Sequence, residues 1–322
     1  MDKSVTTQQT ESLTADYLSN LINIYLKLNV VIYVFIFCLT IATNLCMLSL
    51  IIFKKKFHCK SGWMKASMFF TGILFALLYL LPYRVLGTYW VNNAFICTIL
   101  RLAGPALIIS FNFHWTIINV DRYFYYFYPQ YYNGYRANII VVLSVAAIWL
   151  ISLLCVVIPL YTFMYPLNEE CINLYPSRFL SHFVYILIVF GLFFLIPLII
   201  VLLLFSYILC KINHRNLRQQ MIPSGDAQTA IFMRRINTKV VKHMAIMVGL
   251  FIIFWLPYII LSLMNTSGSS FSMTVAAILS QYFAFSYPAV NPILYACLTA
   301  HYRGEIHRLL LKRTALFIVK PR

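Results

Sequence analysis

Seven long apolar stretches constrain the fold of this chain more than any other feature of its sequence. Each is long enough to cross a bilayer as a helix, which takes about 20 predominantly apolar residues. The stretches are continuous and lack the alternation of apolar and polar residues that marks the strands of a membrane barrel. The sequence therefore predicts an all-α membrane protein, a bundle of seven transmembrane helices. The stretches cover residues 30–53, 64–87, 96–127, 138–162, 180–210, 240–264 and 271–297.

The composition excludes a water-soluble domain. Hydrophobic residues make up 62% of the chain and charged residues 10%, which is too little polar surface to cover a globular protein. The net charge of +17 would suit nucleic acid, but the basic residues flank the apolar stretches instead of forming one face. We therefore expect a protein that is surrounded by membrane lipids and has no nucleic-acid partner.

The basic residues also predict the orientation in the membrane. They are concentrated in the segments after the first, third, fifth and seventh stretches, and cytoplasmic loops are enriched in lysine and arginine. This pattern places the N-terminus outside the cell. We expect an extracellular N-terminus over residues 1–29, the bundle over 30–297, and a cytoplasmic amphipathic helix with a short tail over 298–322. Residues 1–29 contain no apolar core of a signal peptide, so the first helix would direct a multi-pass protein to the plasma membrane.

Two cysteines and one asparagine lead to predictions about the extracellular side of the protein. Five cysteines lie within or at the edges of apolar stretches and Cys59 is cytosolic in this topology, which leaves Cys97 and Cys171 on the oxidising side. We expect these two to form a disulfide bond. Asn265 begins an Asn-Thr-Ser sequon in an outer loop and is a candidate for glycosylation. The cysteines and histidines show no metal-ligand spacing, and we expect no metal and no cofactor.

Ten polar, aromatic and proline residues stand on, or just beyond, the third, sixth and seventh stretches. An acid, an arginine and a tyrosine close the third stretch, where we expect a water boundary, because a charge at the bilayer centre costs roughly a few kcal/mol or more. Prolines in the sixth and seventh stretches remove a backbone hydrogen bond and kink the helix. A snorkelling arginine and ordinary proline kinks would explain each feature singly. The ten residues are Asp121, Arg122, Tyr123, Pro129, Phe251, Trp255, Pro257, Asn291, Pro292 and Tyr295.

These motifs resemble those of the rhodopsin-like (class A) G-protein-coupled receptors. Asn44 in the first stretch, Trp149 in the fourth and Pro197 in the fifth extend the resemblance over the chain from about Asn29 to Arg313. Each motif is weak alone, but their order, each on its own helix and side, is specific. The resemblance implies a receptor and not an enzyme, which transmits an extracellular signal to a heterotrimeric G protein. An inhibitory-type G protein is the first expectation.

The resemblance also implies a mechanism at the cytoplasmic ends of the helices. In the family, the arginine that matches Arg122 is released from the acid that matches Asp121 when the cytoplasmic side opens. The tyrosine that matches Tyr295 swings toward this arginine, which meets the C-terminal helix of the G protein. Such a pair has two arrangements, and a ligand on the far side of the membrane biases the equilibrium between them.

Three departures from the family pattern predict a weakened resting state. Leu74 stands where the family usually has an aspartate, and Phe111 stands where it has the partner serine. We therefore expect the family's sodium site to be lost. Asn237 replaces the glutamate that, when present, pairs with the arginine that matches Arg122. With both restraints missing, we expect high constitutive activity, that is, raised signalling without a ligand.

The outer half of the bundle is expected to hold the ligand. Gly104 stands where receptors for biogenic amines have an aspartate, and Phe285 where opsins have the retinal lysine, which disfavours an amine and excludes a retinal Schiff base at that position. Two arginines at the same depth predict an anionic small molecule, a lipid or a peptide, because arginine prefers carboxylate or phosphate. Both arginines could instead snorkel to the interface or pair with Glu169 and Glu170. The expected ligand residues are Arg84, Arg101, Tyr83, Tyr258, Gln281 and His182.

Other functions stay open on the sequence alone. The acidic N-terminus would suit a chemokine-type receptor, although it lacks the extra cysteine that such receptors usually have. A ligand-independent receptor of viral type is a further alternative, and a seven-helix channel or scaffold is a weaker one. A seven-helix hydrolase would need clustered histidines and acids, whereas His114 and His182 are isolated. A secondary transporter would show repeated halves, which this chain does not.

Overall fold

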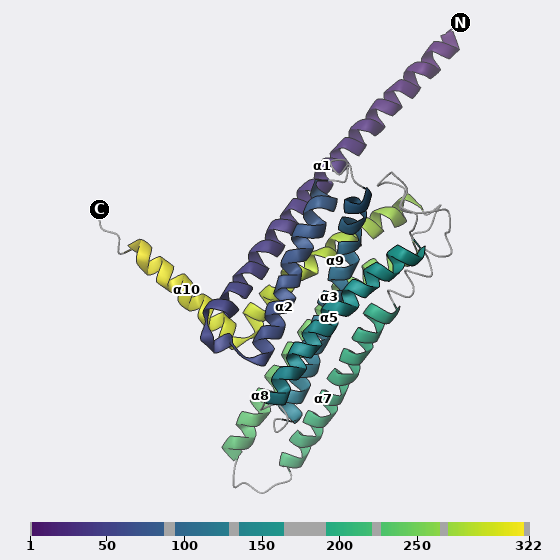
Figure 1. Ribbon diagram of the computed structural model, residues 1–322. Helices are drawn as coiled ribbons and strands as arrows, with labels where there is room; N and C mark the ends of the chain where they lie inside the picture. Colours follow the sequence, from purple (N-terminus) through teal and green to yellow (C-terminus); the bar gives the residue numbers. More distant parts are fainter. Residues whose placement is uncertain are drawn as a thin grey trace.

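The computed structural model of the protein describes six segments of the chain, residues 2–86, 94–128, 135–163, 191–220, 227–264 and 270–318. In these segments every element is a helix, and long helices make up nearly all of the described parts of the seven apolar stretches (Figure 1). The predicted all-α bundle is therefore confirmed. The elements are α1 (Asp2–Phe53), η1 (Lys55–Phe57), α2 (Lys60–Phe75), η2 (Ala76–Val85), α3 (Ala94–Phe127), α5 (Tyr135–Phe163), η3 (Gly191–Leu195), α7 (Ile196–Gln220), α8 (Ala227–Met264), α9 (Phe271–Leu298) and α10 (Ala300–Ile318).

Five segments of the described chain are long and apolar enough to cross a membrane by length and composition alone: Ser19–Phe53, Lys60–Val85, Asn138–Cys155, Gly191–His214 and Val241–Met264. Their outward faces carry large apolar side chains. On α5, for example, Ile140, Leu143 and Leu153 are all about 60% exposed. A water-soluble protein rarely exposes such continuous apolar faces, so lipid is the solvent that these helices require.

The long helices pack around α3 and α9. α3 contacts α2, η2, α5 and α7, and α9 contacts α1 and α8. A large cluster of buried apolar side chains runs through the bundle and joins residues such as Tyr33 of α1, Trp115 of α3 and Tyr287 of α9, and a smaller one holds Ile208 and Met244. α1 is much longer than the predicted transmembrane segment, and its N-terminal part projects beyond the other helices (Figure 1).

A buried polar network fixes α3 against α2 and α5. His114 Nδ1 donates to the Ser110 carbonyl at 2.8 Å, so its Nε2 accepts from the Ser67 hydroxyl at 2.7 Å. The same hydroxyl accepts from Trp149 Nε1 at 3.2 Å. Because lipid supplies no hydrogen bonds, this chain of donors and acceptors satisfies three polar side chains and sets how the three helices face one another.

The second transmembrane helix changes its winding halfway. α2 continues into η2, a π-helix that contains Pro82 and closes with a bond from the Leu86 N–H to the Leu81 carbonyl at 2.9 Å. Proline removes a backbone donor and π-turns are associated with such irregularities. Side chains four residues apart stack along this segment: Phe75 and Tyr79 have ring centroids 5.5 Å apart, and Tyr79 and Tyr83 have centroids 5.4 Å apart.

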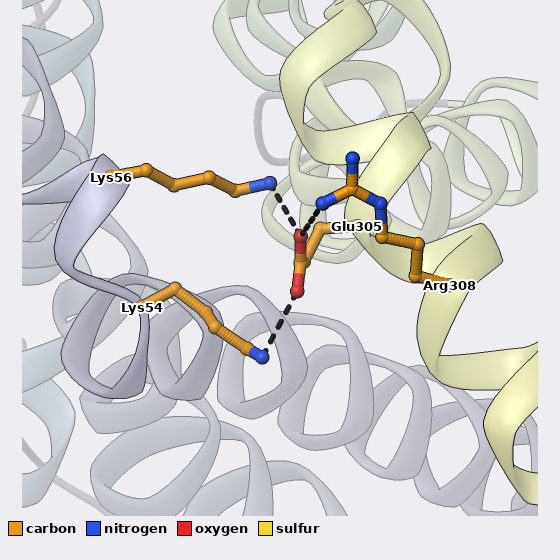
Figure 2. Close-up of polar contacts among 4 residues, drawn as sticks. All are labelled: Lys54, Lys56, Glu305 and Arg308. Atoms are coloured by element: carbon orange, nitrogen blue, oxygen red, sulfur yellow. Dashed lines mark hydrogen bonds and ion pairs between the residues drawn. The ribbon is translucent and has the colours of Figure 1, made fainter.

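α10 turns away from the bundle after α9 ends (Figure 1), and a charged cluster attaches it to the segment that follows α1 (Figure 2). Glu305 of α10 accepts from Lys54 at 3.0 Å and from Lys56 at 2.5 Å, and Arg308 lies 3.6 Å from the same carboxylate. The Glu305 side chain is 7% exposed, whereas the Arg308 side chain is 73% exposed. The hydrogen bonds from Lys56 and Lys54 lower the pKa of Glu305 to about 2.

Two stacked rings lie beside this charged cluster. Phe57 of η1 and Tyr302 of α10 are nearly parallel, with ring centroids 4.4 Å apart, and both side chains are buried. A stacked aromatic pair adds about 0.5–1.5 kcal/mol to the apolar area that it buries. The carboxylate and the ring pair together hold the start of α10 against the connection between α1 and α2.

We expect the Glu305→Gln variant to loosen α10. The substitution leaves Lys54 and Lys56 without their carboxylate, so backbone amides of the first turns of α10 should exchange with deuterium faster in the purified protein. The Arg308→Gln variant, which loses only the exposed and longest contact, should exchange like the wild type. Unchanged exchange in Glu305→Gln would contradict this assignment.

The same contact should depend on pH. The folded pKa of Glu305 lies near 2, below its ordinary value of 4.5, so its stabilisation is complete above about pH 4.5 and disappears as the pH falls toward 2. Hydrogen exchange in α10 of the wild type, measured from pH 6 downward and corrected for intrinsic rates, should accelerate across this window. In Glu305→Gln this acceleration should be absent.

Candidate functional site

Three basic side chains surround the buried ring of Tyr295 near one end of the bundle. The Arg122 guanidinium carbon lies 5.5 Å from the ring centroid and Lys65 Nζ lies 5.6 Å from it. The His243 ring lies 6.1 Å away, and Tyr295 is 1% exposed. These four residues, called here the Arg122 cluster, come from α2, α3, α8 and α9. The two cations Arg122 and Lys65 each attract the aromatic ring by about 0.5–2 kcal/mol, and His243 adds a ring contact, so one ring links four helices.

Asp121 and Tyr123 form a charged triplet with Arg122 and lie at the same end. Asp121 is half-buried on α3. The ring of Tyr123 faces α7, with its centroid 5.7 Å from that of Tyr207 and 5.8 Å from that of Tyr128. Neighbouring Ile208 and Met244 are buried. The triplet therefore divides its contacts, with Arg122 directed to α9 and Tyr123 to α7.

Asn44 of α1 and Asn291 of α9 are fully buried in the bundle. Asn44 Nδ2 donates to the Pro288 carbonyl at 2.9 Å, and Asn291 Nδ2 donates to Met68 Sδ at 3.4 Å. The side-chain oxygen of each asparagine is buried and has no hydrogen-bond partner. A thioether is a weak acceptor, so the amide of Asn291 is poorly satisfied on both sides.

Aromatic rings fill the adjoining part of the bundle. Phe111 of α3 is 2% exposed, and its ring packs edge-on against Tyr287 of α9 with centroids 5.9 Å apart. Leu74 packs against the same apolar core. Among the residues that the structure describes, no group of three or more His, Cys, Asp or Glu side chains could hold a metal ion.

A stack of three rings joins α3, α8 and η3. The rings of Trp115 and Phe251 are nearly parallel with centroids 4.2 Å apart, and the rings of Phe251 and Phe194 have centroids 5.1 Å apart. Trp255 packs against the same stack, with its centroid 6.2 Å from that of Phe194. Pro257 follows within the continuous helix α8. We call Trp115, Phe251 and Phe194 the three-ring stack.

Sequence reasoning selected Phe251 and Trp255 but missed their two partners. Trp115 precedes Arg122 by seven residues, which is two helical turns, and therefore lies on the same face of α3. That spacing was the available signal. Phe194 is one of several phenylalanines in its segment, and nothing in the sequence distinguishes it from the others.

At the opposite end of the bundle, four aromatic rings surround Arg84. Its guanidinium carbon lies 5.0 Å from the ring centroid of Tyr83, 5.5 Å from those of Tyr33 and Phe285, and 5.6 Å from that of Tyr79. Arg84 Nη2 donates to the Tyr79 hydroxyl at 3.0 Å. The rings belong to α1, η2 and α9, and we call this arrangement the aromatic box.

Two further predicted ligand residues adjoin the aromatic box. The Tyr33 hydroxyl donates to Gln281 Oε1 at 3.1 Å, and the ring of Tyr258 lies edge-on to Phe285 with centroids 5.6 Å apart. The structure thus brings together Arg84, Tyr83, Tyr258 and Gln281. Tyr33 and Tyr79 form two sides of the box. They were not selected from the sequence, because tyrosines are frequent throughout this chain.

Gly104 of α3 allows the ring of Tyr79 to approach. A Cβ atom at Gly104 would lie 2.5 Å from Tyr79 Cε2, a distance that real Cβ contacts do not show. The position that carries the aspartate in amine receptors is therefore covered by the aromatic ring that also accepts the hydrogen bond from Arg84.

Several predicted site residues lie outside the described part of the chain. These are Pro129, Cys171, His182 and Asn265. The side chains of Cys97, Arg101 and Asn237 lie outside it as well, although their backbone belongs to helices. The disulfide, the sequon and the second arginine therefore stay predictions.

Comparison with known proteins agrees with this architecture. Residues 43–295 match the family described as "7 transmembrane receptor (rhodopsin family)". This chain belongs to the rhodopsin family of seven-transmembrane receptors. The match spans the helices that carry the Arg122 cluster, the three-ring stack and most of the aromatic box. The family resemblance seen in the sequence motifs is thereby confirmed.

Individual relatives of this rhodopsin-family chain are distant. It is 27% identical to the somatostatin receptor type 4 of Rattus norvegicus over 234 residues, 71% of this chain and 58% of the relative. It is 26% identical to the G-protein coupled receptor homolog FPV021 of Fowlpox virus over 226 residues, 67% of this chain and 64% of the relative. Rhodopsin of Myripristis violacea is 27% identical over 50% of this chain and 46% of its own length. The chain thus spans less than two thirds of these relatives.

We expect the Gly104→Ala variant to be destabilised, because the added methyl group must displace the ring of Tyr79. Overpacking of this kind costs about 1–3 kcal/mol. Gly249 of α8 provides a matched control, since a Cβ there meets no atom within 4 Å. Gly249→Ala should keep or raise the melting temperature of the detergent-purified protein. Equal melting temperatures for the wild type and Gly104→Ala would contradict the close packing described above.

Proposed function

We propose that this chain is a receptor that passes an extracellular signal to a heterotrimeric G protein, with the inhibitory type as the first to test. Membership of the rhodopsin family supports this function at the level of the class. The observation that carries the proposal is the Arg122 guanidinium held 5.5 Å from the centre of the Tyr295 ring. The bundle end with these two residues is the cytoplasmic end in the topology that the basic residues predict, with the N-terminus outside the cell.

The packing of α8 suggests how the cytoplasmic end opens. α8 packs against α9 and α7, and it contributes His243 to the Arg122 cluster and Phe251 to the three-ring stack. An outward movement of its cytoplasmic end would separate His243 from Tyr295 and expose Arg122 to a partner. The three-ring stack links this movement to η3 and α3, so a change at the outer end can bias it.

The proposal includes a high level of signalling without ligand. The family's sodium site would need polar groups where this chain has Leu74 and the buried ring of Phe111. Asn237 removes a carboxylate that could hold Arg122 in the resting state. Tyr295 already lies beside Arg122, a contact that the family resemblance assigns to the open form, while His243 of α8 still packs against the same ring. These features support a small free-energy difference between the resting and active states.

For the ligand we propose an anion, either a small molecule, a lipid or a peptide with an acidic end. The aromatic box supports this class because it contains a guanidinium group among neutral rings. A ligand-independent receptor of viral type is the second candidate. The similarity to a fowlpox virus receptor homologue and the missing restraints on the resting state favour it.

We expect Arg122→Gln to abolish G-protein activation. Replacement removes the charge from the Arg122 cluster and from the contact surface for the G protein, so nucleotide exchange on a purified inhibitory-type heterotrimer should fall by about tenfold or more, which corresponds to ~1.4 kcal/mol. Exchange is measured with the chain reconstituted in lipid vesicles. Lys27→Gln removes an exposed charge in the middle of α1 and should exchange like the wild type. Full exchange by Arg122→Gln would refute the proposed function.

Asn237→Glu should lower signalling in the absence of ligand. A carboxylate at this position could pair with Arg122 and stabilise the resting state by about 1 kcal/mol, which would reduce basal exchange about fivefold. Asn237→Gln adds the same length without the charge and should leave basal exchange unchanged. The comparison is made in cells at equal surface expression. If both variants keep the wild-type level, or if that level equals the level of cells without the chain, raised basal signalling is excluded.

A further inference from the structure

We infer that Arg84 binds the carboxylate of a monoanionic ligand that carries a flat aromatic group, and that this site lies between α1, η2 and α9. The inference rests on the proposed receptor function and narrows its ligand class. Three observations support the inference. Arg84 has N–H donors without a partner, aromatic rings surround it, and it lies on the side of the bundle formed by α1, η2 and α9.

The guanidinium of Arg84 has unused donor capacity. Arginine offers five N–H groups in a fixed fork, and one of them donates to the Tyr79 hydroxyl at 3.0 Å. Arg84 Nε is buried and has no hydrogen-bond partner. A buried donor on a charged group is costly to leave unpaired. A carboxylate matches the fork with two parallel hydrogen bonds, so it would remove this cost.

The walls of the box favour an aromatic ligand. Tyr33, Tyr79, Tyr83 and Phe285 all present ring faces or edges within 5.6 Å of the guanidinium carbon. Rings bind other flat groups by stacked or edge-on contacts. Gln281 accepts from Tyr33 and has two N–H donors of its own, which can hold a carbonyl or hydroxyl of the ligand.

The charge of the box favours a single negative charge. Among the described side chains that line it, Arg84 alone is ionic, and its neighbours are tyrosines, a phenylalanine and a glutamine. A second negative charge would have no compensating cation in this low-dielectric surrounding. A monocarboxylate therefore fits better than a phosphate monoester, which carries close to two charges at neutral pH.

The box is separated from α3. Tyr79 lies directly against Gly104 of α3, so its ring stands between Arg84 and that helix. On the other side, α1 and α9 meet through the Tyr33 and Tyr282 rings, whose centroids are 5.1 Å apart, and through a hydrogen bond of 2.6 Å from the Tyr282 hydroxyl to Asn29 Oδ1. The ring of Tyr79 and the contact between α1 and α9 therefore bound the site on two sides.

The test measures the melting temperature of the purified full chain with pairs of probes that differ only in charge. Phenylacetate and phenylacetamide, each at roughly 10 mM, represent a free small acid. We expect phenylacetate to raise the melting temperature by about 2 °C or more, because a ligand that binds only the folded state stabilises it. Phenylacetamide should give no rise. A tetrapeptide with a C-terminal phenylalanine, as free acid and as amide, represents the end of a peptide.

Variants assign the effect to Arg84. Arg84→Gln should abolish the rise and Arg84→Lys should reduce it, because lysine keeps the charge but loses the fork. Lys27→Gln, which removes an exposed charge from α1, should keep it. A rise with phenylacetate supports a small acid as ligand, and a rise with the peptide acid alone supports a peptide terminus. No rise with either acid, an equal rise with the amides, or a full rise in Arg84→Gln would overturn the inference. If Arg84→Gln does not fold, the comparison of acid and amide on the wild type decides.

The melting-temperature test of the carboxylate site can fail or succeed independently of the nucleotide-exchange test of the proposed function. The melting temperature involves no G protein, so a failed carboxylate test leaves the nucleotide-exchange result unaffected. A chain that is stabilised by phenylacetate but drives no exchange would uphold the site and contradict signalling to G proteins.

Discussion

Lipid offers no hydrogen bonds, so every polar group inside this bundle has to find its partner within the protein. The chain meets this constraint mainly with short contacts between helices. His114, Ser67 and Trp149 satisfy one another across three helices, and Asn44 of α1 reaches a carbonyl of α9. These contacts determine which faces of the helices meet, and they thereby position the residues at both ends of the bundle.

Aromatic rings contact an arginine at each end of the bundle. Arg122 lies over Tyr295 and Arg84 lies among four rings, while Phe111 and the three-ring stack fill the space between them. A contact between a cation and a ring contributes about 0.5–2 kcal/mol. Polar atoms without a partner, such as Asn291 Oδ1 and Arg84 Nε, occur at these same levels.

The helices and the family followed from the sequence, because length and hydrophobicity decide what can cross a bilayer and motif order is visible along the chain. The π-turns of η2 did not follow, because winding depends on how Pro82 packs against neighbouring helices. The attachment of Glu305 to Lys54 and Lys56 joins residues about 250 positions apart, and no local pattern indicates such a pair. The aromatic box was predicted in part. Arg84 could be selected because it is a charged residue in an apolar stretch, whereas Tyr33 and Tyr79 resemble the many other tyrosines of the chain.

The central claim is that the cytoplasmic end of α8 moves away from the bundle when a G protein binds near Arg122. Nitroxide labels at position 53, which is exposed at the end of α1, and at position 242, which is exposed on α8, measure this movement directly in a variant without its exposed native cysteines. The account predicts that the distance distribution between the labels contains a longer component without ligand, and that nucleotide-free inhibitory-type G protein increases this component. A single distance that is the same with and without bound G protein would contradict the account.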